Sequence, residues 1–257
     1  MGHHTHSLVL LMFFAVAAGV VGSFALMKRM LLASDVLSHL ALPGLGIALL
    51  FKINPLVGGA LSLFMGTMFV WKLQKRSTLA TETVIGVVFA AALALGALVT
   101  PHEDLMETLF GDFPEIGVNG FVFGVLAILA AVVFMILARE RLALVVFSED
   151  LAAVAGINVN RMNLYFLLAF SLTILVGLRF MGALLSSALI IVPAAAGRQL
   201  SNRLSRFLLY SSLVSMASVL LGLLTNTYLL RRSSPGPTIA IISTLLFGLS
   251  LLSKRNR

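Results

Sequence analysis

The sequence predicts an all-α protein embedded in a membrane, and three observations support this fold class. Of the 257 residues, 60% are hydrophobic and only 11% are charged, whereas soluble domains carry about 25% charged residues. The mean hydropathy of the chain is +1.06. Its apolar runs are long and continuous, which is typical of membrane-spanning helices and not of the short alternating strands of a barrel. We therefore expect a single transmembrane domain over residues 1–257.

The apolar runs predict about nine transmembrane helices, and eight is the alternative because the turns that bracket the run 180–196 are the weakest in the pattern. Most of the 18 lysines and arginines fall in the loops of one side, which the positive-inside rule assigns to the cytoplasm. This assignment puts the N-terminus outside and the C-terminus in the cytoplasm. The nine runs are residues 8–27, 34–51, 56–71, 83–100, 120–138, 162–178, 180–196, 207–224 and 238–252.

Charge, cysteine content and motifs exclude several function classes. The net charge of +8 comes from short basic clusters between apolar runs, so we expect a lipid bilayer and no nucleic acid as partner. The chain has no cysteine, which excludes disulfides, thiolate metal sites and cysteine nucleophiles. The motifs G-x-x-x-x-G-K-S/T, H-E-x-x-H and G-x-S-x-G are absent, which argues against a phosphate-binding loop, a metalloprotease and a serine hydrolase. We do not expect an enzyme.

The run 34–51 carries two ionisable residues within an apolar stretch. Asp35 and His39 are four residues apart, so on a helix they lie on the same face. A charged group in hydrocarbon costs roughly 3 kcal/mol on insertion scales, and such residues usually face a polar interior and carry function. A carboxylate oxygen and an imidazole nitrogen suit zinc or manganese. We interpret the pair as half of a divalent-metal site, with a purely structural Asp–His pair as the alternative.

Two ligands are too few to close a metal site. Two copies of the chain, with Asp35 and His39 near a two-fold axis, would supply four ligands. The depth of the pair in the membrane depends on residues 30–34, because the pair moves toward the midplane if that segment is also helical and embedded.

Three further residues predict interrupted helices. Pro43 and Gly44 follow the Asp–His pair by about one turn, and Pro193 lies inside a later apolar run. Interruptions free backbone carbonyls, which lipid tolerates only where the carbonyls are buried or line a cavity. We expect helix breaks at these positions along a transport pathway.

The cytoplasmic segment 139–161 contains a short predicted helix. Ser148 has the character of an N-terminal cap, and Glu149 and Asp150 suit the positive end of the helix dipole. Gly156 is an apt residue to end the helix. Such a helix is not needed to cross the membrane. It fits a docking element for a soluble partner, with a lid or simple packing as the alternatives.

The segment 101–119 is the most acidic part of the chain and falls on the outer side. His102, Glu103 and Asp104 lie at its start. One interpretation is an ordinary solvated loop. The other is a negatively charged outer vestibule that raises the local concentration of cations.

Several stretches together resemble the permease subunits of zinc/manganese ABC importers. They occur in order across nearly the whole chain. The stretches are GSFALMKRM (22–30), SDVLSHLALPG (34–44), LMETLFGD (105–112), SEDLAAVAGINVNRM (148–162) and FMGALLSSALIIVPAAAGR (180–198).

The resemblance implies that Asp35 and His39 form the metal site and that residues 148–156 form the coupling helix for a separate ATPase. It also implies a homodimer in a bacterial-type plasma (inner) membrane, a cytoplasmic dimer of ATP-binding subunits and an extracytoplasmic metal-binding protein. Zn²⁺, Mn²⁺ or Fe²⁺ would be transported by alternating access, with no permanently bound cofactor. The alternatives are a stand-alone secondary cation transporter and a membrane scaffold that does not transport.

Overall fold

A computed structural model describes residues 2–77, 79–99, 117–230 and 235–255. The regular elements within these ranges are all helical. In chain order they are α1 (Gly2–Met27), α2 (Ala33–His39), α3 (Leu42–Leu50), α4 (Pro55–Arg76), α5 (Thr81–Val99), α7 (Val118–Leu137), α8 (Arg139–Phe147), α9 (Glu149–Val154), α10 (Val159–Leu200), α11 (Leu204–Thr225), the π-helical turn η1 (Asn226–Leu230) and α12 (Gly236–Arg255).

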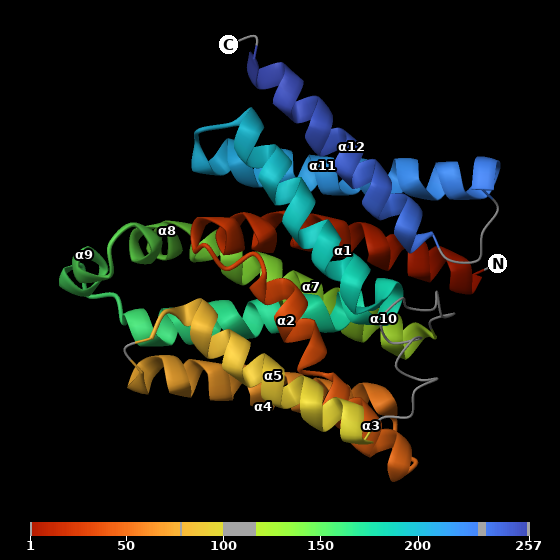
Figure 1. The fold of residues 1–257 in the computed structure, drawn as a ribbon. Helices are drawn as coiled ribbons and strands as arrows, with labels where there is room; N and C mark the ends of the chain where they lie inside the picture. Colours follow the sequence, from red (N-terminus) through yellow and green to blue (C-terminus); the bar gives the residue numbers. More distant parts are fainter. Residues whose placement is uncertain (1, 78, 100–116, 231–234, 256–257) are drawn as a thin grey trace.

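Helix α1 lies at the centre of the bundle. Most of its side chains are buried, and it packs against α7, α10 and α11. Helices α11 and α12 lie on one side of it, and α3, α4 and α5 form a group on the other side (Figure 1). The inner part of the bundle is therefore formed by α1 and α10, with α2 packed against α10, α4 and α5.

The all-α membrane fold is confirmed. Among the described residues, seven helical stretches are long and apolar enough to cross a membrane, and Leu185–Leu200 and Gly236–Leu252 are shorter apolar helices. These stretches coincide with the apolar runs that the sequence predicts. Large apolar side chains are exposed on the outer helices, for example Leu61, Met65 and Phe69 on α4. Lipid tails are as apolar as such side chains, so these faces suit direct contact with lipid.

Basic residues gather at one end of the bundle, which we call the basic end. It holds Lys28 after α1, Arg76 at the end of α4 and Arg161 in the first turn of α10. The short helices α8 and α9 lie at the same end (Figure 1). Helix α2 starts part of the way into the bundle from this end, so the chain turns back inward directly after α1.

Helix α10 is interrupted at Gly182. A continuous helix of 42 residues would be about 63 Å long at 1.5 Å per residue, about twice the hydrocarbon thickness of a bilayer. Gly182 has φ 71° and ψ 177°, a conformation that is essentially confined to glycine. The second half of α10 turns back across the bundle after this residue (Figure 1). The predicted turn near Arg179 is thus present, whereas the break predicted at Pro193 is wrong, because Pro193 lies inside the continuing helix.

The predicted span 34–51 is divided into α2 and α3 by Leu40 and Ala41. The carbonyl oxygen of Leu40 accepts a hydrogen bond of 2.7 Å from the Ser62 hydroxyl of α4, so a backbone group at the break is satisfied by protein and not left to lipid. Pro43 lies in the first turn of α3, where its missing N–H costs nothing. The break therefore comes just before Pro43 and not at Pro43 and Gly44.

Gly44 allows α3 and α4 to approach closely. A methyl group at Gly44 would overlap the carbonyl oxygen of Gly58. We expect Gly44→Ala to lower the free energy of unfolding by about 1–3 kcal/mol, the usual cost of overpacking. Gly86→Ala on α5 is the matched control, because nothing lies within 4 Å of a methyl group there and alanine favours a helix. Thermal unfolding in detergent measures both variants, and equal losses of Tm would contradict this account.

Candidate metal site

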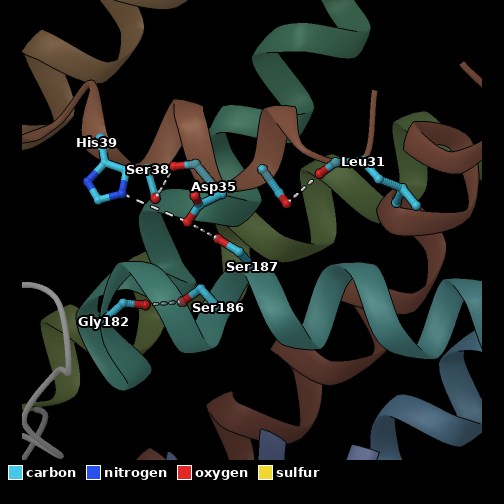
Figure 2. A network of polar contacts seen from close by, with 8 residues as sticks. Leu31, Asp35, Ser38, His39, Gly182, Ser186 and Ser187 are labelled. Atoms are coloured by element: carbon cyan, nitrogen blue, oxygen red, sulfur yellow. Dashed lines mark hydrogen bonds and ion pairs between the residues drawn. The ribbon is translucent and has the colours of Figure 1, made fainter. Parts of the chain in front are cut away.

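Asp35 and His39 lie on one face of α2, as the sequence predicts. The Nε2 atom of His39 is 3.8 Å from Oδ1 of Asp35, and their side chains are 10% and 40% exposed. The imidazole is therefore enclosed, while the carboxylate is still reachable from outside the chain. Figure 2 shows the two side chains pointing toward one another along the helix. The i,i+4 spacing and the helical geometry of residues 33–39 together produce this pair.

The surroundings of His39 leave one imidazole nitrogen without a hydrogen bond among the described residues. Its ring lies 5.4 Å from the ring of Phe89 on α5, centroid to centroid. The Nδ1 atom is buried and has no hydrogen-bond partner among the described residues. Buried polar atoms are normally hydrogen-bonded, so an unpaired one calls for an explanation. The other ring nitrogen, Nε2, faces the Asp35 carboxylate, and an imidazole nitrogen beside a carboxylate oxygen is a suitable donor set for a divalent transition metal.

Ser187 of α10 approaches the pair from the opposite side. Its hydroxyl donates a long hydrogen bond of 3.5 Å to Oδ1 of Asp35, the same oxygen that His39 faces (Figure 2). The neighbouring Ser186 instead bonds back to the Gly182 carbonyl at 2.7 Å. The sequence did not identify Ser187 as part of the site, because its 152-residue separation from Asp35 gives no local signal. The two adjacent serines in an apolar run were the available clue.

The described residues supply only two candidate metal ligands at this site, Asp35 and His39. Among the residues that the structure describes, no three His, Cys, Asp or Glu side chains come together in a metal-binding group. The partly exposed carboxylate of Asp35 leaves room for further ligands from outside the chain. The predicted vestibule residues His102, Glu103 and Asp104 lie outside the described residues, so the vestibule stays a prediction.

The predicted coupling segment forms the helix α9 at the basic end. The Ser148 hydroxyl accepts a hydrogen bond of 3.3 Å from the Leu151 amide, so the predicted N-terminal cap is present. At the other end, Gly156 has φ 77°, and the Ile157 amide bonds to the Ala152 carbonyl at 2.9 Å. This is the Schellman arrangement that ends many helices.

Large apolar side chains on α8 and α9 are exposed. Phe147 and Val154 are 83% and 88% exposed, and Leu151 is also exposed. They lie at the basic end and not along the flanks of the bundle. Apolar groups of this size at the end of a membrane protein indicate a surface for a protein partner.

The long apolar helices and their exposed apolar faces define a polytopic membrane protein. The profile of the ABC 3 transport family matches residues 4–254, so the chain belongs to this family.

Two relatives and one solved structure illustrate the similarity. The chain is 29% identical over 246 residues to the high-affinity zinc uptake system membrane protein ZnuB of Haemophilus influenzae, with 92% of each chain covered. It is 27% identical over 241 residues to the manganese transport system membrane protein MntC of Listeria monocytogenes, with 92% of this chain and 85% of the relative covered. Its fold is similar to that in the structure of PsaBC from Streptococcus pneumoniae in complex with Fab, with a TM-score of 0.82, 22% identity and coverage of 97% of this chain and 91% of that chain.

Gly182 is the residue at which α10 changes direction, and the segment that follows it carries Ser187. We expect Gly182→Ala to cost about 1–3 kcal/mol of stability, because a side chain is strained at this φ and ψ. Gly248→Ala on α12 is the control, since nothing lies within 4 Å of a methyl group there. Chemical or thermal unfolding in detergent compares the two. A Gly182→Ala variant as stable as Gly248→Ala would show that the interruption is not needed.

Proposed function

We propose that the chain is the permease subunit of an ATP-driven importer for a divalent transition metal, Zn²⁺ or Mn²⁺. The observation that carries this proposal is the Asp35–His39 pair, which is enclosed in the bundle and retains an unpaired imidazole nitrogen. Family membership supports it, as do the printed functions of relatives in zinc uptake and manganese transport. The metal is the cargo and not a resident cofactor.

The ligand chemistry fits a site shared by two copies of the chain. Two aspartates and two histidines would supply four oxygen and nitrogen ligands, enough for tetrahedral zinc or for manganese with added water. The exposure of Asp35 at 40% supports a ligand set that is completed by a second copy. At a shared set of ligands Zn²⁺ would bind more tightly than Mn²⁺, following the general order of divalent affinities. Bound metal would be released as the imidazoles protonate.

The basic end fits the cytoplasmic side, with the N-terminus outside. Lys28, Arg76 and Arg161 at this end follow the positive-inside pattern. Helix α9 and the exposed Phe147 and Val154 fit a docking surface for a separate ATP-binding subunit. An extracytoplasmic binding protein would deliver the metal to the opposite end. ATP-driven movement of the docked subunits would then alternate the access of the site between the two ends.

Removal of the ligands tests the proposal. The permease and its ATP-binding subunit are reconstituted in proteoliposomes, and metal accumulation is measured with ATP present. We expect Asp35→Asn and His39→Ala each to lower uptake at least tenfold, because each variant removes one ligand from each copy. His6→Ala is the matched control, because His6 lies in α1 and stacks on Phe121, away from the pair. Its uptake should remain unchanged.

Two results would contradict the proposal. Unchanged uptake in Asp35→Asn and His39→Ala would assign the pair a structural role, as in a scaffold. Equal uptake by the permease with and without its ATP-binding subunit would indicate a stand-alone secondary carrier.

A further inference from the structure

Lys28 links two parts of the bundle at the basic end. It follows α1 directly, outside the membrane-spanning stretch that ends at Met27. Its ammonium group donates a hydrogen bond to Oδ1 of Asn163 in α10 and lies 5.0 Å from the centre of the Phe166 ring. A cation over an aromatic face is attracted by the ring. Lys28 is thus held against the first turns of α10.

A polar cavity of about 420 Å³ lies next to this link. Lys28 and Glu149 both line it, and Glu149 is the first residue of α9. The two side chains form no ion pair, yet the Glu149 carboxylate acts on the ammonium through space: burial lowers the pKa of Lys28 to about 8, and Glu149 offsets part of that effect. The cavity leaves Lys28 and Glu149 room to meet if α9 moves. The charged residues that line the cavity are Lys28, Arg29 and Glu149.

The connection from Lys28 to the metal-site helix is short and hydrogen-bonded. Arg29 adopts φ 57°, a left-handed conformation that non-glycine residues rarely adopt. The turn is held by backbone hydrogen bonds from Met30 to Ala25, from Ala33 to Met30 and from Ser34 to Leu31. Helix α2 begins at Ala33. Because the connecting turn is short and hydrogen-bonded, we expect a displacement of Lys28 to move α2 as well.

We propose that Lys28 is a positioning residue that couples α9 to the Asp35-bearing helix by exchanging its partner. In the present arrangement its partner is Asn163. When the docked ATP-binding subunit displaces α9 toward the bundle, Glu149 replaces Asn163, and the turn 28–32 moves α2 with it. This inference rests on the proposed transport function and adds to it the route by which movement of α9 reaches the metal site.

The ratio of metal transported to ATP hydrolysed, measured in the reconstituted complex, tests this inference. We expect Lys28→Met to lower this ratio at least fivefold, while the amount of assembled complex and its ATP hydrolysis are retained. Lys28→Arg keeps a cation and should retain most of the ratio. Lys72→Met is the control, since Lys72 is an exposed lysine near the end of α4.

A second pair of variants tests the other half of the link. Glu149→Gln should lower the ratio as Lys28→Met does, whereas Glu140→Gln, which neutralises an exposed acid on α8 that does not line the cavity, should not. The double variant should be no worse than either single variant, because both remove the same interaction.

The pH dependence gives a readout that a purely structural role would not change. The pKa of Lys28 is about 8, so the wild-type ratio should fall as the cytoplasmic-side pH rises through this value and the ammonium loses its proton. Lys28→Arg stays charged, and its ratio should be flat over the same range.

The outcomes separate this inference from the proposed function. If the wild-type complex transports no metal, the proposed function fails. If the wild type transports metal and Lys28→Met keeps the wild-type ratio, the coupling role is overturned. It is equally overturned if Lys28→Met lowers only the amount of assembled complex, or if Lys28→Arg shows the same pH dependence as the wild type.

Discussion

Lipid offers no hydrogen-bond partners, so each polar group inside this bundle has to be satisfied by protein. Most hydroxyls bond back to their own helix, as Thr67 does to the Leu63 carbonyl while also meeting Ser171 of α10 at 2.6 Å. A few buried atoms are exceptions among the described residues, including the hydroxyls of Ser211, Ser215 and Ser243. The Nδ1 atom of His39 differs from those hydroxyls, because it belongs to a strong metal donor beside a carboxylate. The unsatisfied nitrogen is therefore consistent with the metal-binding role proposed for His39.

The same constraint explains why the two helix interruptions can exist. Between α2 and α3, the Ser62 hydroxyl donates to the Leu40 carbonyl the hydrogen bond that a helical N–H would otherwise donate. In α10, the interruption at Gly182 is followed by Ser186, which bonds to the Gly182 carbonyl. Figure 2 shows the second of these hydrogen bonds beside Ser187, which contacts Asp35. Both interruptions are therefore next to the site along the chain: one directly follows His39, and the other precedes Ser187 in α10.

The sequence predicts the membrane fold, the apolar runs and the Asp35–His39 pair because each depends on local pattern. Hydrophobic length defines spans, and the i,i+4 spacing is a property of one helix. The N-terminal cap at Ser148 and the end of α9 at Gly156 are also predictable, because each depends on a few adjacent residues. The approach of Ser187 to Asp35 and the link between Lys28 and Asn163 come from packing of distant segments, so no local pattern contains them. The turn expected near Arg179 is present at Gly182, where the reversal uses a backbone conformation that is essentially confined to glycine. The break expected at Pro193 is wrong, because a proline is tolerated within a membrane helix when packing satisfies its surroundings.

The exposed Phe147, Leu151 and Val154 also bear on how the protein is made. If the proposed ATP-binding subunit covers these side chains, a newly inserted chain without that subunit would leave large apolar groups exposed at the basic end, the kind of feature on which proteases and chaperones act. An orphan permease would then be short-lived, and its cellular abundance would follow the synthesis of its soluble partner. Balanced production of the two subunits would thereby be enforced by degradation of the excess.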